Sequence, residues 1–242
     1  MTIFNPVYNA LYAIGYFEPI HPPLTHITIG VVAAALIFGV LALVQRQPSL
    51  ARAARYCLVL AWLFIFPTVL LGFMDWQHWY RGAWLLPIFI KICLASFLFL
   101  LLSLGMILVF TGREESKALL AIYFIAFFTV VGLGYYGGRL VFGGRAPAAP
   151  MGLEAGRRLF ENNCMACHPN LGNAIMPDMT IIGSDNLRDL HSFISLIRDP
   201  RLDNGQKGPM PDFPPQKISD DQARQLYEYL TTVLKGAGHH EH

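Results

Sequence analysis

The strongest chemical signal in the sequence is the run Cys164, Met165, Ala166, Cys167 and His168. Two thiols three positions apart can form thioether bonds to the two vinyl groups of one haem, and the next imidazole then faces the iron. A C-x-x-C pair also occurs in redox dithiols and zinc sites, but a structural zinc site needs two further ligands nearby. Apart from histidines at the C-terminus, no second pair of this kind follows. We therefore expect one covalent haem c on Cys164 and Cys167, with His168 as an iron ligand.

The residues on either side of this run follow an ordered pattern. Gly156 and Phe160 precede it in the spacing G-x-x-x-F-x-x-x-C-x-x-C-H, GPMPDF lies at 208–213, and Tyr229 and Leu230 stand near the end of the chain. In these features the second half of the chain resembles the small single-haem class I cytochrome c domains. The resemblance implies an all-helical domain whose first and last helices cross where Gly156 meets Tyr229.

The resemblance also points to Met210, in the proline-flanked loop, as the sixth iron ligand. A thioether opposite a histidine raises the haem potential relative to two histidines and leaves no open position, which suits electron transfer. Three other side chains could take that place: Met176, Met179 and His191. Methionine more often fills cores, however. Pro169 departs from the family, which usually has glycine there, so the loop at 170–182 is expected to take a different course.

Two more helices are expected in this half. The resemblance places a middle helix over residues 186–198, ended by Asp199 and Pro200. Ser219 is followed three residues later by Gln222, which is the pattern of a capping box at the start of the last helix.

Composition divides the chain in two. The chain has 242 residues, of which 54% are hydrophobic and 14% are charged. Soluble domains average about 25% charged residues, so an ordinary cytoplasmic enzyme is nearly excluded. Residues 1–150 hold 9 Lys and Arg against 4 Asp and Glu, whereas residues 151–242 hold 9 against 12. An apolar, mildly basic half is thus joined to a polar, mildly acidic one. No basic run or stacking motif predicts a nucleic-acid partner.

Four apolar stretches in the first half are long enough to cross a membrane, at residues 27–44, 56–74, 83–110 and 118–138. A helix needs about 20 residues to span roughly 30 Å of hydrocarbon, where backbone groups find no other hydrogen-bond partners. We expect kinks at Pro67 and Pro87, which membrane helices tolerate. Residues 4–20 are too short to span and predict an interfacial helix. No Lys or Arg precedes Arg46, so a cleavable signal peptide is not expected.

The predicted fold is therefore all-α: a four-helix transmembrane bundle followed by a small all-helical cytochrome c domain. We expect the membrane domain at 1–142 and the cytochrome c domain at 151–238. Between them, GGRAPAAP at 143–150 predicts a short, semi-extended linker.

Charges in the loops predict the orientation. Five basic residues lie in the links after the first and third spans: Arg46, Arg52, Arg55, Arg113 and Lys117. Three lie on the other side: Arg81, Arg139 and Arg145. Positive charge favours the cytoplasm, so both ends of the chain are expected outside. Haem attachment to C-x-x-C-H takes place outside the cytoplasmic membrane, as the resemblance implies. Both arguments predict a bacterial inner-membrane protein with a periplasmic cytochrome domain.

The few polar residues of the membrane half are all expected in its outer part: His21, His26, Asp75, His78, Arg81, Lys91 and Arg139. The H-P-x-x-x-H run that starts at His21 and the Asp75-Trp76 pair resemble an uncharacterised family of four-helix membrane domains. The resemblance covers about residues 20–140 and supports the fold more than an activity.

Two hypotheses address these polar residues. His26 and His78, with His21 in reserve, can ligate a haem b between helices. Lys91, inside its span, can contact a haem propionate, Asp75 or a quinone oxygen. The alternative is simple anchoring, because aromatic residues and histidines gather at membrane interfaces and lysine can extend towards water. Cys57 and Cys93 are expected to be apolar fillers, and the histidines at 239–242 to lie in a disordered terminus.

Three functions remain open. The first is a membrane-tethered electron carrier between a quinol-oxidising complex and an oxidase, reductase or reaction centre. The second is an enzyme subunit that oxidises quinol, or carries haem b, and passes electrons to its own haem c. The third is a structural subunit that docks a haem domain onto a larger respiratory complex. All three require lipid and electron-transfer partners.

Overall fold

The computed structural model describes residues 4–112, 116–202 and 204–237. Within these ranges the chain is helical, and its one extended pairing is an isolated bridge between Arg201 and Lys207. The helices are α1 (Asn5–Ala13), α2 (Pro22–Gln45), α3 (Pro48–Trp79), α4 (Leu86–Phe110), α5 (Lys117–Phe142), α6 (Glu154–Asn163), α7 (Leu190–Arg198) and α8 (Asp220–Ala237), with short 3-10 turns η1 (Pro169–Leu171) and η2 (Asp185–Leu187). The predicted all-α class is confirmed.

The chain forms two compact units. One contains residues 18–76 and 86–137, and therefore most of α2 to α5. The other contains α1, residues 77–85 and the described residues from 138 onward. Each unit has its own apolar core.

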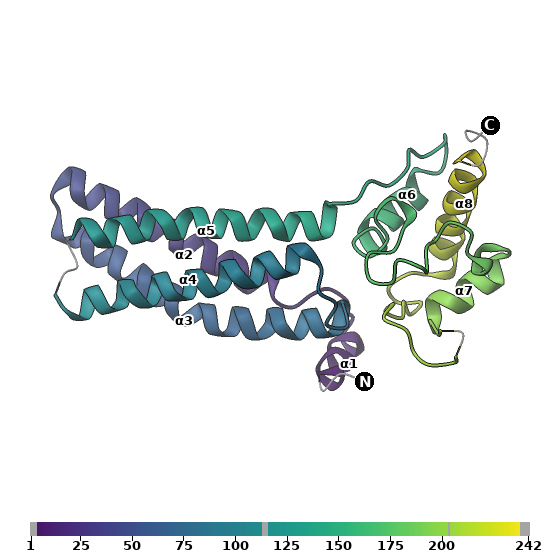
Figure 1. Ribbon diagram of the computed structural model, residues 1–242, viewed down its shortest axis with the longest axis horizontal. Coiled ribbons are helices and arrows are strands. Elements are labelled where there is room, and N and C mark those ends of the chain that lie inside the picture. Colours follow the sequence, from purple (N-terminus) through teal and green to yellow (C-terminus); the bar gives the residue numbers. More distant parts are fainter. Residues whose placement is uncertain (1–3, 113–115, 203, 238–242) are drawn as a thin grey trace. The chain divides into compact units, whose positions relative to one another are not determined.

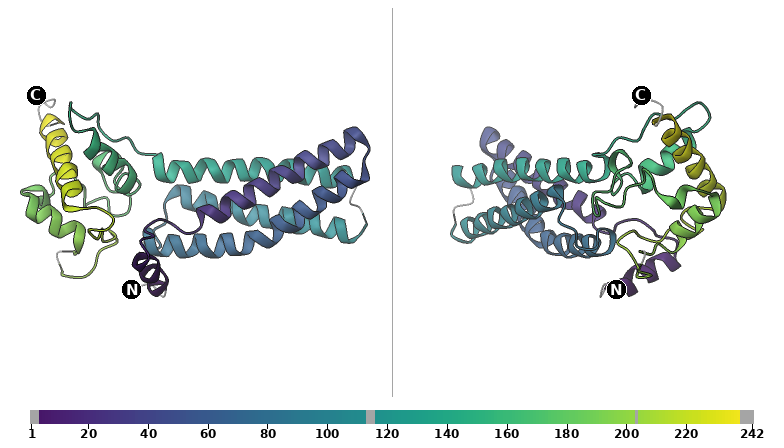
Figure 2. Two further views of the ribbon diagram at one scale, coloured as in Figure 1. Left: turned by 180° about the vertical axis from the view of Figure 1, so that it is seen from behind. Right: turned by 45° about the vertical axis from the view of Figure 1, so that its right-hand side comes forward.

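Helices α2 to α5 are each long and apolar enough to cross a membrane. They lie side by side in all views (Figures 1 and 2). The helix α1 has nine residues, too few to span. Pro67 lies inside α3, whereas Pro87 is the second residue of α4. The expected kink at Pro87 is therefore wrong: proline at a helix start replaces an N–H that has no partner within the helix anyway.

Small residues let the bundle helices approach closely. Gly39 of α2 lies against the ring of Tyr123 on α5, and Gly105 of α4 lies against Leu58 on α3. Such contacts are typical of membrane helices, which associate by close packing because lipid is as apolar as their side chains. Trp62 Nε1 donates to Ser103 Oγ over 3.0 Å, which links α3 to α4.

In the C-terminal part, α6 packs against α8 (Figure 1). Gly156 makes this contact possible: a Cβ at that position would lie 2.7 Å from Tyr229 Cβ and would overlap the Gln225 carbonyl oxygen. The predicted meeting of Gly156 and Tyr229 is confirmed. Around it lies a set of buried residues that we call the C-terminal core: Ala146, Phe160, Met165, Leu171, Phe193, Ile197, Phe213, Ile218, Ala223, Leu226, Tyr229 and Leu230.

The helix caps explain where α7 and α8 begin. Ser219 N donates to Gln222 Oε1 over 2.9 Å and Gln222 N donates to Ser219 Oγ over 3.3 Å, so the predicted capping box is present. The middle helix was expected from residue 186 but begins at Leu190. Asp189 caps it by accepting a hydrogen bond from Ser192 N over 2.8 Å, and the preceding residues form η2 instead.

The segment 143–150 packs against the C-terminal core. Ala146 is 4% exposed, and the Pro147 carbonyl accepts a hydrogen bond from the Tyr229 hydroxyl over 2.7 Å. Arg145 N donates to Asn170 Oδ1 over 3.2 Å. This segment has no regular secondary structure, but its contacts fix it to the helices that follow, unlike the spacer that the sequence predicts.

Candidate functional site

The C-x-x-C-H run forms a tight turn at the end of α6. Cys164 is the C-cap of that helix, and its carbonyl accepts hydrogen bonds from Cys167 N over 3.1 Å and from His168 N over 2.8 Å. The two thiols and the imidazole therefore leave the chain within one compact turn. This is the arrangement that attachment of one porphyrin at two points requires.

The ring of His168 is oriented by a single hydrogen bond. Its Nδ1 lies 2.8 Å from the Gly172 carbonyl oxygen, and a carbonyl can only accept, so Nδ1 carries the proton. The lone pair is then on Nε2, the atom that can bind a metal. Burial lowers the pKa of His168, an effect opposed by the bond to Gly172. The neutral, metal-binding form is thereby favoured at neutral pH.

Pro169 begins the turn that brings the Gly172 carbonyl back to His168. The next two residues, Asn170 and Leu171, have φ angles of +54° and +62°, in the left-handed region that non-glycine residues seldom adopt. Leu171 is 4% exposed and belongs to the C-terminal core, which holds this backbone in place. Packing of Leu171 in the C-terminal core thus stabilises the turn after His168.

Both thiols of the run lie in apolar surroundings. Burial raises the pKa of Cys164 to about 12 and that of Cys167 to about 11. Cys164 packs directly against the C-terminal core. Uncharged sulfur is the form found in a thioether, so the environment of both atoms fits attachment to a haem.

Met210 packs against the same core as Cys164. Of the three rivals, Met179 is 40% exposed. His191 is exposed on α7, whose buried residues are Phe193 and Ile197. Met176 is half-buried in the loop before Pro177. The structure therefore favours Met210 over the two exposed rivals, and its thioether together with the His168 imidazole fits the donor set of a haem iron.

Among the described residues, no three His, Cys, Asp or Glu side chains gather closely enough to hold a metal ion directly. The histidines at 239–242 lie outside the described residues. The C-x-x-C pair therefore gains no zinc partners within the described ranges.

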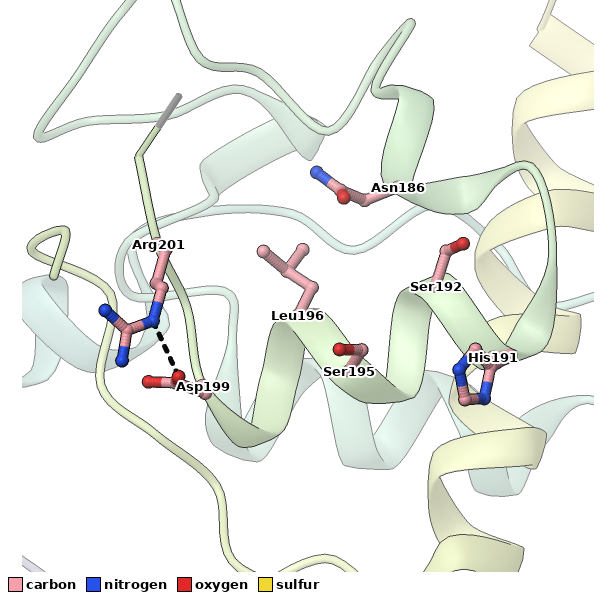
Figure 3. Close-up of a pocket in the computed structure, with 7 residues that line it drawn as sticks. All are labelled: Asn186, His191, Ser192, Ser195, Leu196, Asp199 and Arg201. Carbon is pink, nitrogen blue, oxygen red and sulfur yellow. Dashed lines mark hydrogen bonds and ion pairs between the residues drawn. The ribbon is translucent and has the colours of Figure 1, made fainter. Parts of the chain in front are cut away.

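A shallow polar hollow lies on the outer side of α7 (Figure 3). His191, Ser192, Ser195 and Leu196 line it, with Asn186 on one side and the ion pair between Arg201 and Asp199 on the other. Cys164, Cys167, His168 and Met210 do not belong to this lining, and of the rival iron ligands only His191 does.

In the membrane half, the buried Asp75 side chain of α3 forms hydrogen bonds with the residues just before α2. Its side chain is 4% exposed and lies 2.5 Å from Nδ1 of His21. The backbone N–H groups of Ile20 and His21 also donate to it, over 3.1 and 2.9 Å. Since α2 begins at Pro22, the Asp75 carboxylate acts as a cap for that helix, supplied by another helix.

Lys91 is half-buried on α4, and its Nζ lies against Gly137 of α5, 3.8 Å from where a Cβ would be. The contacts that the sequence left open for Lys91, with a haem propionate, Asp75 or a quinone oxygen, stay predictions. His21 and Asp75 form a hydrogen-bonded pair in the unit that contains most of α2 to α5.

The two expected haem b ligands have other surroundings. His26 is exposed, while its near neighbour Thr28 faces the inside of the bundle. His78 stacks on Tyr8 with ring centroids 3.7 Å apart, and its Nε2 lies 2.8 Å from the Tyr12 hydroxyl. These surroundings give the haem b hypothesis no support.

The sequence did not reveal the hydrogen-bond partners of His21 and His78. The Asp75 bond to His21 joins residues 54 positions apart, and the Tyr12 bond to His78 joins residues 66 positions apart. The only local signals were the H-P-x-x-x-H run and the Asp-Trp pair. Neither signal specifies which residues meet.

Fold and site together define a multi-pass membrane protein that carries a cytochrome c domain. The model of the family described as "Predicted membrane protein (DUF2231)" matches residues 17–148, and the chain belongs to this family. A second model, described as "Cytochrome C oxidase, cbb3-type, subunit III", matches residues 152–230. The two resemblances expected from the sequence are thus confirmed.

Two curated relatives match the C-terminal part. Cytochrome c6 of Gracilaria tenuistipitata var. liui is 35% identical over 78 residues, which cover 32% of this chain and 69% of the relative. Cytochrome c6 of Cyanidium caldarium is 29% identical over 82 residues, which cover 32% of this chain and 68% of the relative. No solved structure is significantly similar to the chain.

Proposed function

We propose that this protein is a membrane-anchored cytochrome that transfers electrons through a single haem c. Cys164 and Cys167 would attach the haem, and His168 and Met210 would hold its iron. The observation that carries the proposal is the turn at the end of α6, where His168 donates from Nδ1 to the Gly172 carbonyl over 2.8 Å beside two half-buried thiols. Met210 and Cys164 pack on one core, which supports the proposed sixth ligand.

Each residue has a distinct task. The haem, when bound, supplies a one-electron redox couple. The Gly172 carbonyl fixes the tautomer and the orientation of His168, and such a bond also makes the imidazole a better donor. A thioether from Met210 would raise the potential relative to a second histidine, and the two protein ligands together would exclude oxygen. These residues suit electron transfer rather than oxygen chemistry.

The partners proposed are other electron-transfer proteins of the membrane, in a respiratory or photosynthetic chain. The family model that matches residues 152–230 is named after an oxidase subunit, and both curated relatives are named cytochrome c6. Attachment to the bundle keeps the haem near such complexes and raises its effective concentration without new contacts. A role as a subunit of a larger complex is compatible with the same arrangement.

We propose the cytoplasmic membrane of a bacterium as the location, with the cytochrome domain on the periplasmic side. Four spans bring the beginning and the end of the bundle to the same side. Three arginines, Arg46 between α2 and α3 and Arg52 and Arg55 in the first turns of α3, support placement of that end of the bundle in the cytoplasm.

A reduced-minus-oxidised absorption spectrum of the purified full chain, before and after acid–acetone extraction, tests this function. We expect a c-type spectrum that survives extraction unchanged, because haem c is covalent and haem b is not. Extractable haem would support the alternative in which the bundle carries haem b and feeds the haem c. A spectrum without any haem band would contradict the proposal.

A further inference from the structure

Lys217 holds an unusual position in the turn before α8. Its Nζ donates to the Phe17 carbonyl oxygen over 2.9 Å, although the two residues are 200 positions apart. The same ammonium lies 4.6 Å from the centre of the Trp79 ring and 5.7 Å from that of Phe213. All four residues belong to one compact unit.

These contacts replace part of the water around a positive charge. The Trp79 face attracts the ammonium through its negative quadrupole, and the carbonyl accepts one of its three protons. Lys217 is half-buried as a result. A charge held in this way is screened by salt much less than an exposed lysine.

The ammonium is also close to the haem attachment site. Phe213, whose ring lies 5.7 Å from the ammonium, belongs to the GPMPDF loop and to the C-terminal core against which Cys164 and Met210 pack. Reduction adds one electron to the haem, so a nearby fixed positive charge stabilises the reduced state relative to the oxidised one. Charge near the cofactor is one of the means by which a protein sets its potential.

We propose that Lys217 raises the reduction potential of the haem and that Trp79 and Phe17 hold its ammonium in the position where it does so. The inference rests on the proposed attachment of haem to Cys164 and Cys167. It assigns to residues from the membrane half, Phe17 and Trp79, a positioning role for the redox centre. A change at Trp79 would then alter the haem potential from outside the C-terminal core.

Potentiometric titration of the purified full-length haem protein tests this inference. We expect Lys217→Met to lower the midpoint potential while the absorption spectrum stays unchanged, and Lys217→Arg to restore most of the potential. The matched control is Lys235→Met, which removes one charge from an exposed position on α8 and should leave the potential close to that of the unaltered protein. Trp79→Leu should lower the potential, and Trp79→Phe, which keeps an aromatic face, should lower it less.

Equal potentials for Lys217→Met and Lys235→Met would overturn the inference, provided that both proteins bind haem. If Lys217→Met does not fold, the Trp79→Leu protein provides the test, because it keeps Lys217 and removes the ring that holds the ammonium. An unchanged midpoint potential in Trp79→Leu overturns the inference. Absence of haem from the unaltered protein would instead contradict the proposed function. The haem spectrum therefore tests the proposed function and the midpoint potential tests the role of Lys217, so failure of one can be told from failure of the other.

Discussion

His168 shows how one backbone carbonyl can prepare an imidazole for the iron-binding role proposed for it. The Gly172 oxygen determines which ring nitrogen carries the proton, and burial favours the neutral ring. The carbonyl reaches the ring because Asn170 and Leu171 adopt left-handed backbone angles. At the scale of single residues, the site depends on a turn whose conformation most side chains disfavour.

Met210 provides a test at the same scale. Met210→Leu should lower the haem midpoint potential and alter the absorption spectrum, because a strong thioether ligand is lost. Met179→Leu is the matched control, since Met179 is 40% exposed, and it should leave both properties unchanged. If Met179→Leu altered the haem midpoint potential and Met210→Leu did not, another methionine would be the iron ligand.

Among the helices, the crossing of α6 and α8 is the contact most sensitive to size. Gly156→Ala should destabilise the C-terminal unit by about 1–3 kcal/mol, because the added methyl group overlaps Tyr229 and the Gln225 carbonyl. Denaturant unfolding, followed through the haem spectrum, gives the free energy of unfolding. Arg158→Ala, at an exposed position of α6, should change it by less than about 0.5 kcal/mol. Equal stabilities for both variants would contradict the close crossing.

The start of α2 depends on a carboxylate from α3. Asp75→Leu removes the acceptor for the N–H groups of Ile20 and His21 and for the His21 ring. An unsatisfied buried donor costs about 1–3 kcal/mol, so we expect a clearly lower Tm in detergent. His26→Leu, at an exposed site of α2, should leave the Tm nearly unchanged. A Tm for Asp75→Leu equal to that of the control would show that the cap adds nothing.

Some elements of this fold follow from local sequence, and others depend on contacts between distant residues. The spans follow from continuous apolar runs, and the start of α8 follows from Ser219 and Gln222. The helix α7 begins at Leu190 and not at residue 186 because the Asp189 side chain caps it there. The packing of Ala146 and Pro147 was missed because Gly, Ala and Pro in 143–150 look like a spacer until Tyr229 is placed beside them.

The candidate site likewise contains residues that local sequence identifies and contacts that only the fold reveals. Cys164, Cys167 and His168 are recognisable because haem attachment requires a fixed local spacing, whereas Met210 required the family resemblance. The bonds from His21 to Asp75 and from Lys217 to Phe17 join residues far apart in the chain. Periodicity and motifs carry no information on such pairs, so these contacts came from the fold alone.

For the whole molecule, the central consequence of the proposed function is the topology of the chain in the membrane. Four spans and a C-terminal cytochrome domain require the turn between α2 and α3 and the helix α7 to lie on opposite sides of the membrane. A membrane-impermeant thiol reagent applied to intact spheroplasts should label Ser195→Cys, which is exposed on α7. It should label Ser49→Cys, exposed in the first turn of α3, only after the membrane is permeabilised. The reverse pattern would contradict the proposed orientation.

Intact-protein mass spectrometry of the purified, denatured chain tests the central claim most directly. The account predicts the mass of the polypeptide plus one haem, because two thioether bonds survive denaturation. The double substitution of Cys164 and Cys167 by alanine should remove that added mass, whereas the same change at Cys57 and Cys93 should keep it. A mass equal to that of the polypeptide alone, from cells able to attach haem, would contradict the account.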